Sequence, residues 1–157
     1  MPRPKRYRRM RRPPGMQGFK PFGGICEDDK IEHLLYEEYE ALRLVDFESL
    51  SQDAAAEKMG VSRPTLTRIV DSARKKIAGA FINGRVILFD GGHIEFDKNW
   101  YRCNECELIF DIEPGKSDKV ICPFCDSEDV VFINEELKRR GEIMERRRSG
   151  DRREERQ

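Results

Sequence analysis

Residues 50–84 read LSQDAAAEKMGVSRPTLTRIVDSARKKIAGAFING, and this stretch decides the expected fold. Ser51 is a good N-cap for a helix of about two turns, and Gly60 can end that helix. Ser62 then caps a longer helix that runs to the Asn-Gly pair, with Pro64 in its first turn, where a missing N–H costs nothing. Two helices joined by a short turn predict a helix-turn-helix, whose second helix enters the major groove of DNA.

The small and apolar residues of this stretch fit the packing of such a motif. Ala56 falls where the two helices would touch, Gly60 falls in the turn, and Val61, Leu66 and Ile69 fall at packed positions. An ordinary helical hairpin without a ligand is the alternative interpretation of the same pattern.

The outward face of the longer helix is basic and rich in hydroxyl groups. Arginine and threonine in its first two turns suit base edges, because arginine can pair with guanine through two hydrogen bonds. Basic residues further along the helix suit phosphates, whereas a merely solvated face is the alternative. The predicted DNA contacts are Ser62, Arg63, Thr65, Thr67, Arg68, Arg74, Lys75 and Lys76.

Charge is sorted into blocks although the formal net charge is zero. Residues 1–20 hold eight basic and no acidic residues, whereas residues 21–60 hold three basic and eleven acidic residues. We therefore expect residues 1–29 to be a flexible basic arm that binds a polyanion. Pairing between the basic and acidic blocks inside the fold is the alternative.

Short β-rich runs follow the helices. The runs 86–89 and 93–96 flank Asp90-Gly91-Gly92, a turn sequence typical of a hairpin. With an amphipathic helix predicted from about Ile31 to Phe47, residues 30–97 should form an all-α helix-turn-helix domain of three helices with an appended hairpin.

Two cysteine pairs mark a second domain at residues 98–134. Fifteen residues separate Cys103-x-x-Cys106 from Cys122-x-x-Cys125, a spacing typical of a four-cysteine zinc site. We therefore predict a small β zinc ribbon with one zinc per chain. Iron in a rubredoxin-like site would use the same ligands, but the rubredoxin pattern has knuckles further apart, each followed by glycine. Redox disulfides are a minor alternative, and Cys26 is expected to be a free thiol.

The remaining features exclude several classes. Residues 135–157 are almost all charged and predict an exposed helix or a disordered tail. Apolar runs fall far short of the roughly 18 residues of a membrane span, and no apolar segment follows the basic start, so we expect a cytoplasmic protein. Neither of the two histidines accompanies a nucleophile motif, and no phosphate-binding glycine loop occurs, so we do not expect an enzyme.

The sequence resembles a family of small prokaryotic proteins of unknown function, domain of unknown function 134, which is predicted to bind DNA. The resemblance rests on YEALRL at residues 39–44, LSQ at 50–52, AAAEKMGVSRPT at 54–65 and ARKKI at 73–77, and it covers roughly residues 1–92. The three-helix part is also similar to region four of bacterial sigma factors, which reads promoter elements.

These features together predict a sequence-specific protein that binds double-stranded DNA and regulates transcription. The acidic character of the ribbon favours contact with a protein partner or with a second copy of the chain. A regulator that senses metal or oxidant through an iron site, and an RNA-binding module, are the alternatives.

Overall fold

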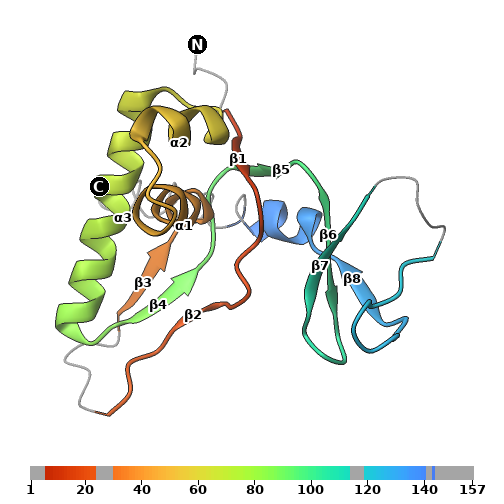
Figure 1. Ribbon diagram of the computed structural model, residues 1–157. Coiled ribbons are helices and arrows are strands. Elements are labelled where there is room, and N and C mark those ends of the chain that lie inside the picture. The colour runs from red at the N-terminus through yellow and green to blue at the C-terminus, as the bar shows by residue number, and fades with distance from the viewer. Residues whose placement is uncertain (1–5, 24–29, 114–118, 141–142, 144–157) are drawn as a thin grey trace, which may run out of the picture.

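The computed structural model describes residues 6–23, 30–113, 119–140 and 143. Its helices and strands form a mixed α/β fold, so the expected all-α helix-turn-helix domain is wrong (Figure 1). The longest helix lies at one side of the molecule and a three-stranded sheet with the cysteines lies at the other, with two further sheets between them. Among the described residues, no helix is both long and apolar enough to span a bilayer.

Both helices predicted in the opening stretch are present. The helical part consists of α1 (Tyr36–Leu42), the π-helical turn η1 (Arg43–Phe47), α2 (Gln52–Met59) and α3 (Arg63–Asn83). The Ser51 hydroxyl accepts a hydrogen bond from the Ala54 N–H (3.2 Å) and so caps α2. Gly60 ends α2 with φ of 66°, a left-handed conformation that glycine adopts without steric cost.

The described residues contain eight strands in three sheets. The strands are β1 (Arg8–Met10), β2 (Gly18–Phe19), β3 (Ile31–Leu34), β4 (Val86–Phe89), β5 (Ile94–Phe96), β6 (Asn99–Cys103), β7 (Ile109–Ile112) and β8 (Val130–Phe132). β1 pairs with β5 in parallel, and β4 lies between β2, which is antiparallel to it, and β3, which is parallel. β6 lies between β7 and β8 in an antiparallel sheet, which we call the four-cysteine sheet.

The predicted hairpin of residues 86–89 and 93–96 is wrong, because β4 and β5 pair with strands from the N-terminal region instead. Gly91 and Gly92 do turn the chain, with φ of 77° and 91°. The turn is tied to other elements, however, because the Asp90 N–H donates to the Leu34 carbonyl and the Gly91 carbonyl accepts from the Tyr36 N–H. The two strands therefore diverge after the turn into different sheets.

The expected flexible arm is also wrong for residues 6–23, which run along the folded domain and contribute β1 and β2. Met10 is fully buried, and Pro13 and Pro14 are buried after it. Glu40 of α1 also anchors this segment, because the Arg11 backbone N–H donates to Glu40 Oε1 (3.1 Å). Burial of these apolar side chains and this hydrogen bond stabilise the segment against the folded domain, although few of its residues are hydrophobic.

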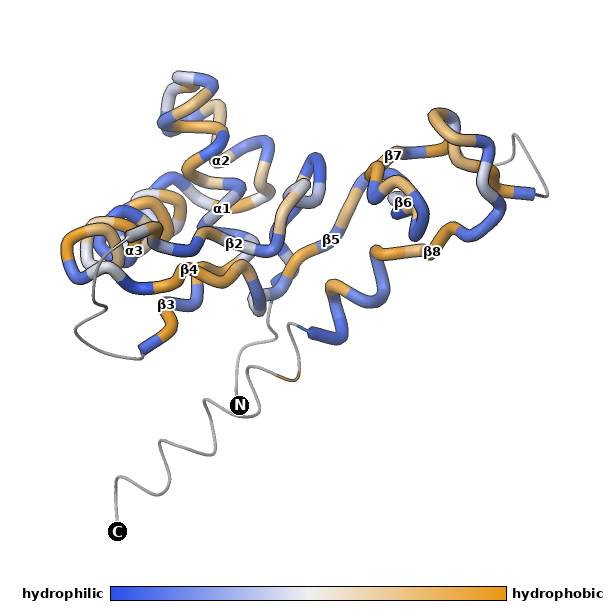
Figure 2. The backbone as a smooth tube through the Cα atoms, turned by 90° about the horizontal axis from the view of Figure 1, so that it is seen from below, coloured by the Kyte–Doolittle hydropathy of each residue, from blue (hydrophilic) through white to orange (hydrophobic). Residues whose placement is uncertain are grey.

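One hydrophobic cluster spans the sheets and the helices. It consists of Met10, Leu34, Tyr36, Ala73, Phe89, Ile94, Trp100, Ile133 and Leu137. Figure 2 shows the chain at β5 leading from the helical part towards the four-cysteine sheet. Residues 134–140 are helical and bury Leu137, so the beginning of the expected tail is packed. A second cluster of small and aliphatic side chains holds α2 against α3.

Candidate metal centre and nucleic-acid interface

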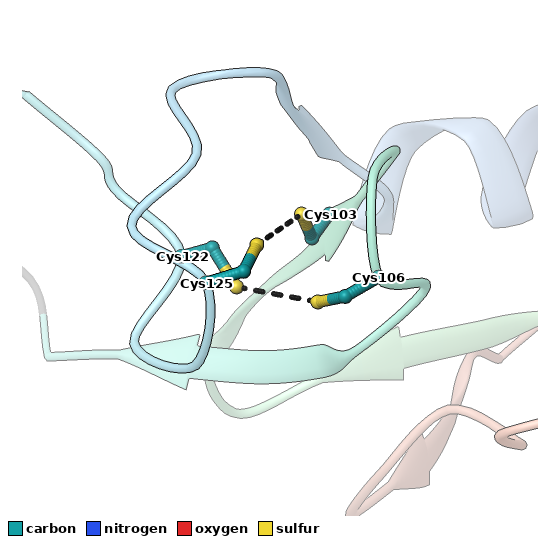
Figure 3. Close-up of side chains that lie close together, drawn as sticks. All are labelled: Cys103, Cys106, Cys122 and Cys125. Carbon is teal, nitrogen blue, oxygen red and sulfur yellow. Dashed lines mark hydrogen bonds between the residues drawn. The ribbon is translucent and has the colours of Figure 1, made fainter.

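The four-cysteine sheet supplies two turns that each carry a cysteine pair. Cys103 ends β6 and Cys106 lies in the turn that follows, whereas Cys122 and Cys125 lie in a turn before β8 (Figure 3). Backbone bonds close both turns: the Cys103 N–H donates to the Leu108 carbonyl (3.0 Å), and the Cys122 N–H donates to the Ser127 carbonyl (2.9 Å). The two turns have the same construction and face each other.

The four sulfur atoms all lie within 4.8 Å of one another. The distances from Cys103 Sγ to Cys125 Sγ and from Cys106 Sγ to Cys122 Sγ are both 3.6 Å. A tetrahedral site with metal–sulfur bonds of about 2.3 Å has sulfur–sulfur edges of about 3.8 Å. The cysteines expected from the spacing therefore come together, and they can hold a metal ion.

Backbone N–H groups stabilise negative charge on these sulfurs. Burial opposes ionisation of Cys122, but hydrogen bonds from the Cys125 and Phe124 N–H groups outweigh it and lower the pKa of this thiol to about 7. A bond from the Ser127 N–H favours the Cys125 thiolate, yet burial and the three neighbouring cysteines raise the pKa of Cys125 to about 12. Four thiolates thus repel one another in the absence of a cation, and a bound metal removes that repulsion.

The residue after each cysteine pair adopts a left-handed conformation. Glu107 has φ of 59° and Asp126 has φ of 55°. These are the positions at which the rubredoxin pattern has glycine, so the knuckle conformation is retained here by residues with side chains. A non-glycine residue in this region costs of the order of 1 kcal/mol or more. The spacing alone did not reveal this strain, although glutamate at such a position is uncommon.

The outward face of α3 divides into free and paired cations. Arg68 and Lys75 are exposed and have no ion-pair partner among the residues that the structure describes. Arg63 lies 3.6 Å from Asp53, with both side chains largely exposed. Arg74 is also exposed and binds Asp46 through two nitrogens at 2.6 and 3.2 Å, and these hydrogen bonds raise the pKa of Arg74.

The remaining predicted contacts near the start of α3 have partners within the protein. Ser62 Oγ and Thr65 Oγ1 lie 2.8 Å apart. The Thr67 hydroxyl donates to Gln52 Oε1 (2.9 Å), so Thr67 links α3 to α2. The bond of Thr67 to Gln52 helps to hold the two helices together, a role that the sequence did not reveal.

Lys76, which was predicted to contact phosphates, is instead half-buried. Its ammonium donates to Glu38 Oε2 (2.6 Å) and to the His33 carbonyl (2.9 Å). Glu38 is itself buried and also accepts from the Ser72 hydroxyl (2.7 Å) and from the Leu35 N–H (2.9 Å). A buried carboxylate requires a cationic partner, which explains why Lys76 turns inward.

A second buried carboxylate, Glu40, organises the other side of α1. It accepts two bonds from the Arg43 guanidinium, at 2.9 and 2.7 Å. Hydrogen bonding to Glu40, with further attraction from Glu48, raises the pKa of Arg43 above its ordinary value. The amphipathic pattern of α1 gave no sign of these bonds, because alternating charge on a helix usually faces solvent.

The basic N-terminal segment lies beside the turn between α2 and α3. The Arg9 side chain lies next to Gly60. A Cβ atom at this glycine would be 3.8 Å from Cδ and Nε of Arg9. The described N-terminal end of the chain and α2 lie at the same end of the molecule (Figure 1). The proximity of Arg9 to this turn has no signal in the local sequence, since it arises from the pairing of β1 with β5.

The model of a family described as "Protein of unknown function DUF134" matches residues 1–97. The chain belongs to this family. The match includes the helical part and the strands up to β5, and it ends before the first cysteine of the metal centre. The resemblance stated from the residues is thereby confirmed at the level of the family.

Relatives in the family carry the same kind of name. A "UPF0251 protein" of Chloroherpeton thalassium is 42% identical over 130 residues, which is 83% of this chain and 85% of that one. The "UPF0251 protein" of Clostridium beijerinckii is 42% identical over 132 residues, covering 83% and 88% of the two chains. An archaeal "UPF0251 protein", from Methanothermobacter thermautotrophicus, is 38% identical over 136 residues, covering 87% and 70%. No solved structure matches the chain.

Proposed function

We propose that this protein binds DNA in a sequence-specific manner and regulates transcription, with α3 in the major groove. The observation that carries the proposal is the α2–turn–α3 unit, which leaves the first turns of α3 exposed and presents Arg68 without an ion-pair partner in the described part of the chain. A guanidinium in the first two turns of such a helix can reach the edge of a guanine and pair with it through two hydrogen bonds.

The ion pairs on α3 are compatible with this function. Arg63 with Asp53 and Arg74 with Asp46 are exposed pairs, and such pairs contribute about 0–1 kcal/mol. A phosphate or a base edge can therefore replace either carboxylate at little cost. Lys76 is excluded from the interface, because exchange of its bond to buried Glu38 would leave an unpaired buried charge.

The N-terminal segment extends the proposed interface. Arg9 lies beside Gly60, in the turn that leads into α3. Further basic residues precede Arg9 in the sequence. Basic segments next to a docked helix can neutralise phosphates or enter the neighbouring minor groove. This position favours a contribution to affinity in addition to the structural role of β1.

We further propose that the metal of the four-cysteine sheet is zinc, one ion per chain, and that this sheet is a zinc ribbon. The sulfur positions suit tetrahedral coordination, and a sheet with a small core of its own would gain folding energy from the ion. Spacing favours zinc over iron, since the two pairs are fifteen residues apart. Elemental analysis and the absorption spectrum test this: a red protein with bound iron would refute zinc.

Selection of bound duplexes from a random pool tests the DNA proposal, and a recovered consensus is the expected result. We then expect Arg68→Ala to reduce discrimination between the consensus and a random duplex by about 1–3 kcal/mol, because it removes a contact to a base edge. Lys75→Ala should weaken both duplexes alike, and Lys30→Ala, which removes an exposed cation outside α3 and outside the N-terminal segment, is the matched control.

Equal weakening of both duplexes by Arg68→Ala would contradict the orientation of α3. A competition with single-stranded and double-stranded RNA addresses the other class of nucleic acid. Preferential binding of RNA over the selected duplex would replace the proposal with an RNA-binding function.

A further inference from the structure

A cavity of about 720 Å³ lies between α1 and the four-cysteine sheet. It is lined by the segment after β1, which contributes Arg11 and Arg12, by Tyr39 of α1, and by Trp100 of β6. Ligand sites in proteins have volumes of roughly 300–1,000 Å³ and commonly lie where separate structural units meet. This cavity has the size and the position of such a site.

The charges of the lining do not cancel. Arg43 is bound by Glu40 and Glu48, and Lys98 donates to Asp111 at 2.6 Å. Arg11 and Arg12 are exposed, and neither side chain has an ion-pair partner within the described part of the chain. The guanidinium groups of these two lining residues therefore leave the cavity positively charged.

Aromatic groups form another part of the lining. The Arg12 guanidinium lies over the Trp100 ring, with its central carbon 5.8 Å from the ring centroid. Trp100 is only 6% exposed and belongs to the central hydrophobic cluster, so its ring is held rigidly. Burial raises the pKa of Tyr39, and its hydroxyl, which is protonated at neutral pH in any case, can donate a hydrogen bond.

We propose that this cavity binds a small organic phosphate with a flat ring, of the nucleotide class. Guanidinium groups pair with phosphate oxygens through two parallel hydrogen bonds, which favours a phosphate at Arg11 and Arg12. The volume exceeds what an inorganic phosphate fills, and Tyr39, with the small exposed part of Trp100, lines the space that remains for the ring. None of the lining residues belongs to α3, so the site is separate from the proposed DNA interface.

Trp100 is the only tryptophan of the chain and therefore reports on this cavity directly. The experiment titrates the full, metal-loaded chain with ADP, AMP, pyrophosphate and adenosine, and it follows tryptophan fluorescence and the heat of binding. We expect saturable binding of ADP or AMP, weaker binding of pyrophosphate and the weakest binding of adenosine. Arg11→Gln and Arg12→Gln should each weaken binding by about tenfold or more, because each removes a charged hydrogen-bond donor.

Lys20→Gln is the matched control, since Lys20 is an exposed cation that does not line the cavity. Calorimetry is needed for Arg12→Gln, because loss of the guanidinium itself changes Trp100 fluorescence. Absence of saturable binding at millimolar nucleotide would overturn the proposal, and so would equal affinities for pyrophosphate and ADP. A response to duplex DNA alone would assign the arginines to nucleic acid instead. No DNA is needed for the nucleotide titrations, so their failure leaves the proposed function untouched.

Discussion

Removal of residues 2–12 tests whether the basic N-terminal segment belongs to the folded core. Met10 is fully buried, and truncation of a buried methionine costs about 2–5 kcal/mol. The deletion also removes the Arg11 N–H from buried Glu40, and a hydrogen bond to a charged group contributes about 1.5–3 kcal/mol. We expect a loss of about 4–8 kcal/mol, which is a large share of the about 5–15 kcal/mol that stabilises a typical protein.

A shorter deletion separates the structural role from the electrostatic one. Removal of residues 2–6 leaves β1 and Met10 in place, so the free energy of unfolding should change by less than about 1 kcal/mol. It removes three basic residues, and the slope of log affinity against log salt falls by about 0.9 for each phosphate that is no longer neutralised. The slope should therefore fall by up to about 2.7 while the fold is retained. Met10→Ala is the matched point variant, with a cost of about 2–5 kcal/mol.

Urea unfolding followed by circular dichroism and by Trp100 fluorescence measures the stabilities, and titration of a selected duplex at several salt concentrations measures the slope. Unfolding of the 2–12 deletion at the same urea concentration as the full chain would refute the burial argument for this segment. A normal salt slope in the 2–6 deletion would show that the first basic residues make no phosphate contacts.

Three further outcomes follow from particular contacts. Cys103→Ser should destabilise the helical part as well as the four-cysteine sheet by about 3 kcal/mol or more, because Trp100 of the same strand is in the shared core. Thermal unfolding of the variant and of the metal-loaded full chain measures this, and an unchanged helical transition would contradict the coupling. Glu107→Gly should raise the stability of the four-cysteine sheet by about 1 kcal/mol in urea titrations, because glycine adopts the left-handed φ of this position freely. A loss of stability would show that contacts of the Glu107 side chain contribute more than the backbone strain costs. Glu38→Ala should cost about 3–5 kcal/mol, because it leaves half-buried Lys76 unpaired, and the double variant Glu38→Ala with Lys76→Met should recover part of that loss.

Local signals in the sequence predicted the local parts of this structure. α2 begins after Ser51 and ends at Gly60, as expected, because a cap acts within one turn of the helix that it begins or ends. The four cysteines also met as expected, since two short turns of the same construction need only face each other across one sheet. Both predictions depended on residues whose role is set by their immediate neighbours.

The mixed α/β fold could not be predicted in this way, because its sheets join segments that are distant in the chain. β1 pairs with β5, some 86 residues later, and β3 pairs with β4 across the whole helical part. Asp90-Gly91-Gly92 has the composition of a hairpin turn, but composition does not say which strand a following run will join. The burial of Met10 was hidden for a related reason: a single apolar residue among arginines gives no periodic pattern.

β6 connects the features on which the proposed functions depend. Its beginning places Trp100 in the central cluster and in the wall of the cavity, and its end places Cys103 in the metal centre. The same cluster contains Met10 of β1, whose neighbour Arg9 lies beside the turn that leads into α3. The metal centre and α3 are therefore connected through one core, because Ala73 of α3 belongs to the same cluster as Trp100. The two ends of this protein are for that reason expected to respond together in equilibrium unfolding, although their sequence motifs are independent of each other.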